Sequence, residues 1–373
     1  MEEILTEILK ANKYKKGKKL GEGGDGLAYE VIKNNKTYAA KLIKLNPKAK
    51  ECEADIIKEF RGPNIVKFNY VEKKTVANSI YYLIVMEKAT FNSLAHFLHD
   101  IRRNNILDII YGSSFQIIGD NLLRFFISQL IQGLEILNRN NFCHFDIKPQ
   151  NILVFQGLYI KWADFGYLRD LETIAIEDKN NNNNNNDGKK IDVPGGTRGY
   201  FSPEFYLNKG EILLKQAFKH DYFGLGATIY YMKYGKNMLN YYDSGREEKD
   251  YIMTSNQIIE QIEKKKDEIK SDKSSDKEFI DLLCSLIQYS PEQRPDLESM
   301  YKNKWLNKNR EEINSIVEIN DTDAKKILME INKSDFLIKK KMYLDSIHKK
   351  NNEKNKYRKF KFNLEKNSGK FIL

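Results

Sequence analysis

The stretch HFDIKPQN, residues 144–151, brings a histidine, an aspartate, a lysine and an asparagine together within a few positions. Asp146 and Asn151 stand at its two ends, and Lys148 lies between them. Pro149 prevents the stretch from forming the interior of a helix, so its polar groups can converge from a loop. We therefore expect this loop to supply several side chains to one polar site.

A second acidic position follows in the tripeptide Asp164-Phe165-Gly166, directly after LYIKWA, which has the composition of a strand. Two carboxylates, an amide oxygen and a lysine at the mouth of a cleft suit phosphoryl transfer. One aspartate can orient a hydroxyl group and accept its proton, while the other and Asn151 can hold Mg²⁺. Taken alone, each piece also fits an ordinary polar turn.

Upstream, the segment GEGGDG contains Gly21, Gly23 and Gly26. Glycine allows the backbone to approach a phosphate closely and to point its N–H groups at it. Lys41 ends YAAK in a run that otherwise suits a buried strand, where a lysine is costly unless it meets an anion. Glu53, on a predicted short helix, could be that partner. The alternatives are a hairpin turn, a surface lysine and a solvated helix face.

The order of predicted elements indicates an α+β fold with two lobes. The first third of the chain has strand-like segments around one short helix, which ends at Gly62-Pro63. From Asp120, a possible helix cap, apolar residues recur at helical spacing, and further helices are predicted around 219–234 and 275–288. A β-rich lobe followed by a helical lobe places a cleft between them.

Composition limits the function classes. The net charge is +10, but residues 339–373 carry twelve basic and three acidic side chains, so the body of the chain is almost neutral. Cys52, Cys143 and Cys284 form no C-x-x-C pair, which disfavours a zinc site or a disulfide scaffold. The charged N-terminus does not resemble a signal peptide, and no apolar run is long enough to span a membrane. We expect a cytoplasmic protein that binds no nucleic acid.

Taken together, these motifs resemble those of eukaryotic protein kinases. The family's G-x-G-x-x-G, A-x-K, H-R-D-x-K-x-x-N, D-F-G and A-P-E motifs read here as GEGGDG, AAK, HFDIKPQN, DFG and SPE. The resemblance implies a bilobal protein-kinase fold with a β-rich N-lobe and a helical C-lobe. The expected divisions are an N-terminal extension (1–13), a kinase domain (14–308) with its N-lobe (14–87), C-lobe (88–308) and activation segment (164–204), and a basic, partly helical tail (309–373).

The resemblance also implies residue roles, with ATP and Mg²⁺ as cofactors. Asp146 is the expected catalytic base, Lys148 contacts the γ-phosphate, and Asn151 and Asp164 bind Mg²⁺. Lys41 contacts the α- and β-phosphates and pairs with Glu53, and Thr197 contacts the catalytic aspartate. Arg294 is expected to pair with Glu204 in a structural contact. The residues expected around the nucleotide are Gly21, Gly23, Gly26, Ala28, Ala39, Lys41, Met86 as gatekeeper, and Glu87, Lys88 and Ala89 in the hinge.

Two departures concern regulation. Phe145 replaces the arginine of H-R-D, which in the family gathers a phosphate placed on the activation loop. Between Gly166 and Thr197 the only hydroxyl groups are those of Tyr167 and Thr173. We therefore predict an activity that is not controlled by phosphorylation of this loop; alternatively, the phenylalanine fills an apolar pocket and regulation lies elsewhere. The run of asparagines at 180–186 is predicted to be a disordered insertion.

The sequence thus predicts a serine/threonine protein kinase whose substrates are proteins. DIKPQN has a lysine two positions after the base, whereas tyrosine-specific kinases resemble D-L-A-A-R-N. One alternative is a pseudokinase scaffold that acts by binding, although Lys41, Asp146, Asn151 and Asp164 are all retained. Another is a small-molecule kinase, which usually lacks a segment like GTRGYFSPE. The basic tail could bind a partner or an anionic surface.

Overall fold

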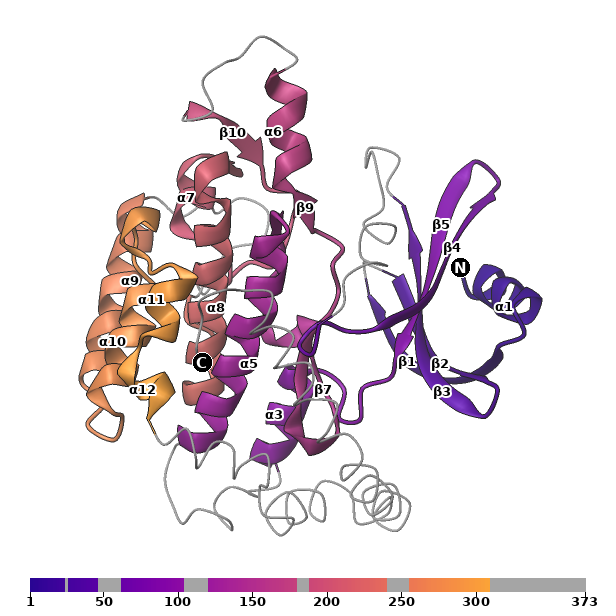
Figure 1. Cartoon of the computed structure of the whole chain (residues 1–373), viewed down its shortest axis with the longest axis horizontal. Helices are drawn as coiled ribbons and strands as arrows, with labels where there is room; N and C mark the ends of the chain where they lie inside the picture. The colour runs from indigo at the N-terminus through magenta and orange to yellow at the C-terminus, as the bar shows by residue number, and fades with distance from the viewer. Residues whose placement is uncertain (24–25, 46–61, 104–119, 180–187, 240–254, 309–373) are drawn as a thin grey trace, which may run out of the picture.

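A computed structural model describes residues 1–23, 26–45, 62–103, 120–179, 188–239 and 255–308. Its first lobe is a five-stranded antiparallel sheet in the order β1-β2-β3-β5-β4 (Figure 1). The hairpin between β2 and β3 turns at Asn34 and Asn35, whose φ angles of 51° and 58° match the twist of adjacent strands. The strands are β1 (Lys15–Gly23), β2 (Gly26–Lys33), β3 (Lys36–Lys44), β4 (Phe68–Val76) and β5 (Ser79–Glu87).

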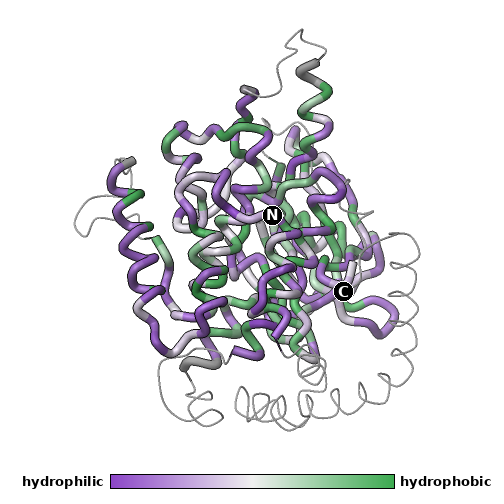
Figure 2. Tube along the Cα trace, turned by 60° about the vertical axis from the view of Figure 1, so that its left-hand side comes forward, coloured by the Kyte–Doolittle hydropathy of each residue, from purple (hydrophilic) through white to green (hydrophobic). Residues whose placement is uncertain are grey.

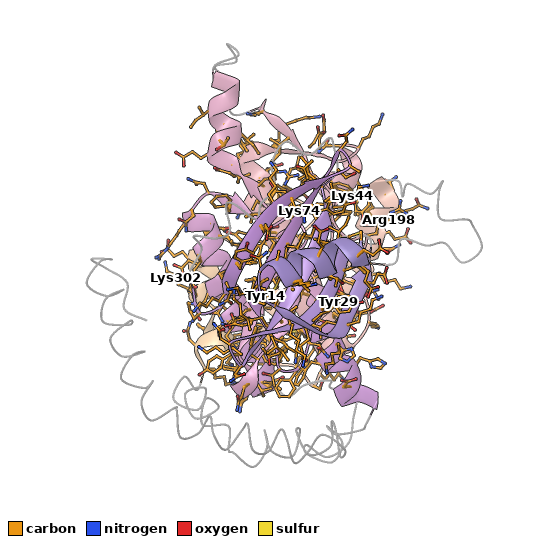
Figure 3. All side chains as sticks on the ribbon, turned by 90° about the vertical axis from the view of Figure 1, so that its right-hand side faces the viewer. Tyr14, Tyr29, Lys44, Lys74, Arg198 and Lys302 are labelled. Carbon is orange, nitrogen blue, oxygen red and sulfur yellow. The ribbon has the colours of Figure 1, made fainter. Side chains whose placement is uncertain are left out.

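The helix α1 (Glu2–Ala11) lies across one face of this sheet. Its side chains Leu5, Ile8 and Leu9 are fully buried, in one apolar cluster with residues of β2, β3 and β5. Glu2 accepts hydrogen bonds from Lys16 and Tyr29 at the end of the helix. Figure 3 looks onto this side, with Tyr29 and Lys74 labelled near the helix. The opposite face of the sheet carries Lys41, whose ammonium group contacts Asp164 of the second lobe.

The second lobe is built around two long helices, α5 (Asp120–Arg139) and α8 (Ala217–Tyr234), which contact each other and are largely buried. Gly235, with a φ of 72°, ends α8 in the left-handed conformation common at helix C-termini. Figure 2 shows hydrophobic segments concentrated in the interior and hydrophilic segments at the periphery. Around them lie the helices α3 (Leu94–Arg103), α9 (Ser255–Lys270), α10 (Lys277–Leu286), α11 (Leu297–Tyr301) and α12 (Lys304–Asn307).

Short strands and helices between α5 and α8 carry the loops of the site. β6 (Phe142–Cys143) pairs with β9 (Arg169–Asp170), and β7 (Ile152–Val154) pairs with β8 (Ile160–Trp162). After β9 come α6 (Leu171–Lys179) and then β10 (Lys190–Asp192), which pairs with β11 (Glu211–Leu213) beyond α7 (Pro203–Leu207). In Figure 1 the helix α6 and the strand β10 stand at the top of the second lobe.

The predicted α+β architecture with a β-rich first lobe and a helical second lobe is confirmed. The sequence analysis did not place several elements, among them α1, which was expected only as part of an N-terminal extension, and β4, α6, α9, β10 and β11. Asp120 is the first residue of α5, and its carboxylate binds Lys233 at 2.9 Å. Among the residues described, no helix is both long and apolar enough to cross a membrane. The predictions for Glu53, the asparagine run and the basic tail fall outside the described residues.

Candidate active site

The loop between β6 and β7 is held in place by the carboxylate of Asp221. Asp221, buried on α8, accepts hydrogen bonds from the backbone N–H groups of His144 and Phe145 at 2.7 and 2.9 Å. Phe145 has a φ of 63°, in the left-handed region that non-glycine residues rarely adopt. The chain then continues into a short 3₁₀ helix that begins at Pro149. This turn sends Phe145 into the protein and presents the next residue, Asp146, to the site.

Asp146 is the centre of a polar network. Its Oδ1 accepts a hydrogen bond from Thr197 Oγ1 at 2.9 Å. Its Oδ2 lies 2.7 Å from both Asn151 Nδ2 and Lys148 Nζ. Only 4% of Asp146 is exposed, so these partners replace the water that an ionised carboxylate needs. The carboxylate is therefore held in one orientation, in which it can receive a proton from a hydroxyl group.

Lys41 and Asp164 connect the two lobes. Lys41 Nζ, on β3, lies 2.7 Å from Asp164 Oδ1, which follows β8 in the second lobe. Burial of the Asp164 carboxyl opposes its ionisation, but the charge of Lys41 and its hydrogen bond outweigh that cost. The pKa of Asp164 is therefore lowered from its usual value, with smaller contributions from His144 and Lys148. An ionised carboxylate thus faces a lysine across the junction of the lobes.

The strand register aligns the residues expected around the nucleotide. Ala28 is paired with Lys41, and Ala39 with Met86. Because side chains alternate along a strand, these residues share the sheet face opposite α1. Gly26 has a φ of 132°, and a Cβ there would lie 2.1 Å from the carbonyl oxygen of Leu42, so only glycine fits.

The hinge after β5 carries two ion pairs that join it to different parts of the molecule. Glu87 Oε1 lies 2.6 Å from Lys161 Nζ on β8, and it also accepts a hydrogen bond from the backbone N–H of Lys67. Lys88 Nζ lies 2.9 Å from Glu30 Oε2 on β2. The sequence analysis found Glu87 and Lys88 but not their partners. These contacts fix the backbone that leads to Ala89.

A column of aromatic rings links the sheet to the catalytic loop. The ring of Phe165 lies 6.0 Å from that of Phe68 on β4 and 5.2 Å from the imidazole of His144. His144 also packs against Trp162, and its Nε2 is 3.2 Å from the carbonyl oxygen of Ala163. Sequence reasoning quoted Phe165 and His144 within motifs but gave them no role. Their burial became visible only in the structure, and the available sequence signal was their position beside the aspartates of the two motifs.

Asn151 and Asp164 have the donor chemistry that Mg²⁺ prefers. Asn151 uses its amide nitrogen for Asp146, which leaves its amide oxygen for a cation. Asp164 provides a carboxylate kept ionised by its surroundings. Mg²⁺ is commonly held by only one or two protein oxygens together with water and substrate phosphates, so this small donor set fits the ion.

Arg294 and Glu204 form a buried pair beneath this site. The guanidinium donates two hydrogen bonds to the carboxylate, both of 2.7 Å, and also bonds the backbone oxygens of Gln288 and Lys219. Burial disfavours the charged form of Glu204, but Arg294 outweighs it and the pKa of Glu204 is lowered. The pair anchors the start of α7 to the end of the second lobe.

This fold and this set of side chains define a protein kinase domain. The chain matches the family described as the protein kinase domain over residues 14–306, and it belongs to that family.

The chain is 28% identical to the serine/threonine-protein kinase polo of Drosophila melanogaster, across 81% of this chain and 46% of polo. It is 25% identical to the serine/threonine-protein kinase atg1 of Dictyostelium discoideum, across 78% of this chain and 39% of atg1. It is 30% identical to the cGMP-dependent protein kinase egl-4 of Caenorhabditis briggsae, across 58% and 25% of the two chains. The chain thus spans less than half the length of these relatives.

Proposed function

We propose that this chain transfers the γ-phosphate of ATP to serine and threonine hydroxyl groups of protein substrates. The observation that carries the proposal is the network in which Asp146 contacts Lys148, Asn151 and Thr197 at 2.7–2.9 Å. Relatives that carry the name serine/threonine-protein kinase support the choice of acceptor.

Each side chain has a distinct task in this proposal. Asp146 orients the acceptor hydroxyl and takes its proton as the oxygen attacks. Lys148 and Lys41 offset the negative charge of the phosphates. Asn151 and Asp164 would hold Mg²⁺, which supplies further neutralisation of the phosphate charge when bound. Catalysis then rests on positioning and electrostatics, because the protein forms no covalent intermediate.

The sheet supplies the nucleotide pocket. Ala28, Ala39 and Met86 share one face of β2, β3 and β5 with Lys41, and we assign the adenine to the hinge at Glu87–Ala89. Gly21, Gly23 and Gly26 flank the tight connection of β1 to β2, which we assign to the phosphates. Glu53, the proposed partner of Lys41 in the nucleotide-bound protein, lies outside the described residues.

The test compares Asp146→Asn with the wild-type protein in transfer of labelled γ-phosphate to a generic protein acceptor. The amide keeps the size of the side chain but cannot take the proton, so transfer should fall by roughly 10²–10⁴-fold. Asp267→Asn, which changes an exposed carboxylate on α9, is the matched control and should behave as wild type. Acid hydrolysis of the product should yield phosphoserine and phosphothreonine. Nucleotide binding without transfer to any acceptor would contradict the proposal and favour a scaffold.

We further propose that the activation segment needs no phosphate to adopt its working shape. Phe145 is 1% exposed and belongs to an apolar cluster that holds this segment. The backbone of β10 pairs with β11, and this ladder fastens the second half of the segment to the lobe. Packing and main-chain hydrogen bonds here supply the order that a phosphate–arginine contact would otherwise supply. The other members of the cluster are Cys143, Leu171, Ile191, Ile212 and Ala217.

A further inference from the structure

Ser202 and His220 form a buried polar pair that the proposed catalytic steps do not use. Ser202 Oγ lies 2.7 Å from His220 Nδ1, and the two residues are 0% and 3% exposed. Ser202 precedes α7, and His220 lies on α8 beside Asp221, which holds the catalytic loop. The serine also stands where the A-P-E motif has alanine, so this chain has a hydroxyl group that the motif lacks.

The imidazole of His220 is surrounded by aromatic rings from two other segments. Its centroid lies 5.6 Å from the ring of Phe145 in the catalytic loop and 6.0 Å from that of Phe201. Phe201 in turn stacks on Phe205 of α7 at 4.0 Å. Because Ser202 follows Phe201 directly, its hydrogen bond to His220 fixes where the Phe201 ring lies against the His220 imidazole.

Phe145 and Phe201 lie close to the backbone of Gly196 and so restrict the conformation of the residues that lead into Thr197. Gly196 has a φ of 144°, and a Cβ at this position would lie 2.8 Å from the carbonyl oxygen of Phe145 and 2.5 Å from the Phe201 ring. The gap enclosed by Phe145, Thr197, Phe201 and His220 is too narrow for a water molecule. A shift of the Phe201 ring is therefore transmitted to Gly196 and to Thr197, which donates its hydrogen bond to Asp146.

We propose that Ser202 and His220 are positioning residues. They hold the backbone of segment 196–201 in the conformation that contacts the acceptor segment of a protein substrate. The inference rests on the proposed function, because it assigns a task within that reaction. An acceptor hydroxyl that reaches Asp146 must pass beside Thr197, so the adjoining chain of the substrate contacts segment 196–201. Lys41 and Asp164 lie outside the set of contacts, and only Lys148, which bonds Thr197, links the set to the phosphates, so the pair acts more on the acceptor than on ATP.

The pair works with a neutral imidazole. Burial lowers the pKa of His220; Glu204, Asp221 and Asp146 nearby favour the protonated form, and Arg294 opposes it. In the neutral ring one nitrogen donates and the other accepts, so a single serine hydroxyl suffices as the partner of Nδ1. Removing either partner leaves the other buried without its hydrogen bond, which costs more than the bond itself contributed.

The experiment measures peptide phosphorylation and, without peptide, the slow hydrolysis of ATP by Ser202→Ala, His220→Phe and the double variant. Each single change should raise the KM for the acceptor peptide by roughly 5- to 20-fold, because the segment 196–201 is no longer held in the position that receives the peptide. The KM for ATP should stay at the wild-type value, and the hydrolysis of ATP should change much less than peptide transfer. The double variant should be no worse than the more impaired single variant, because both remove the same contact.

Two further variants separate this role from general stability. Ser285→Ala removes a serine hydroxyl that donates to the Leu282 carbonyl oxygen within α10, and it should leave both reactions unchanged. His220→Asn retains a polar atom near the Nδ1 position and should restore much of the peptide KM that His220→Phe loses. Ser202→Ala removes a single atom, so it decides the question even if His220→Phe does not fold.

The inference is overturned if peptide KM is unchanged in Ser202→Ala, or if ATP hydrolysis and peptide transfer fall in parallel. A wild-type protein that binds ATP but transfers no phosphate contradicts the proposed function itself, and the inference with it. If the wild-type protein transfers phosphate normally and the variants have the same peptide KM as wild type, the inference is contradicted but the proposed function is not.

Discussion

Phe145 and Asp146 are neighbours in one loop, yet their side chains lie in opposite environments. Asp146 is held by an amide, an ammonium and a hydroxyl group. Phe145, 1% exposed, contributes to an apolar cluster and packs on His220. The polar side of the loop carries the side chains to which we assign phosphoryl transfer, whereas on the apolar side phenylalanine stands where the H-R-D motif has arginine. Two adjacent residues can therefore have different tasks: Asp146 belongs to the polar site, and Phe145 packs the loop against the rest of the lobe.

The backbone makes this division possible. The left-handed φ of Phe145 reverses the chain locally, and Asp221 holds the reversed N–H groups. Such a conformation costs free energy in a bulky residue and persists only where the surroundings fix it. The same buried carboxylate therefore supports both the catalytic side and the packed side of the loop.

The largest effect is expected for a change in the polar residues of the candidate active site. Asp164→Asn removes the ionised carboxylate that faces Lys41, so kcat/KM for phosphotransfer should fall by roughly 10²–10⁴-fold, as for other groups that stabilise charge in a transition state. Initial rates at saturating ATP check this. Because the change also breaks the ion pair with Lys41, the urea midpoint should fall moderately, and a large loss of stability with little loss of rate would reverse the assignment.

On the apolar side, Phe145→Ala should lower the free energy of unfolding by about 3–5 kcal/mol, because it leaves a cavity in a packed cluster. Urea denaturation measures the change. Ile176→Ala, which truncates a side chain of α6 that is 51% exposed, is the control and should cost no more than about 0.5 kcal/mol. A Phe145→Ala protein as stable as wild type would show that the cluster does not hold the loop.

A smaller effect is expected from pH. Because burial lowers the pKa of His220 in the folded protein, the unfolded chain binds a proton more readily as pH falls below about 6.5. Stability should therefore decrease from pH 7 to pH 5.5, by at most about 1.4 kcal/mol per pH unit from this residue. Urea titrations of wild type and His220→Phe at both values test it. Equal pH dependence in the two proteins would remove His220 as the source.

Motifs and periodicity were sufficient to predict the two lobes and to choose residues that the structure brings together, such as Lys41 with Asp164 and Asp146 with Thr197. They were not sufficient for α1. Leu5, Ile8 and Leu9 do follow a helical spacing, but a helix of this length is marginal until it packs on the sheet.

Other features depend on contacts between distant segments. Glu87 meets Lys161, and Ser202 meets His220 across two helices, and no local pattern indicates either contact. For Phe145 the sequence left open whether the ring fills an apolar pocket, and its burial shows that it does. These contacts and this burial are set by tertiary packing between distant segments, which a local sequence pattern does not reveal.

The most direct test of the account is the activity of protein treated with phosphatase, with mass spectrometry to establish that residues 164–204 carry no phosphate. Transfer of γ-phosphate from ATP to a protein acceptor in the presence of Mg²⁺ should remain close to that of untreated protein, because we propose that packing around Phe145 holds the described parts of the segment, 164–179 and 188–204, without a phosphate. Loss of nearly all transfer after dephosphorylation, with recovery on rephosphorylation, would contradict the account.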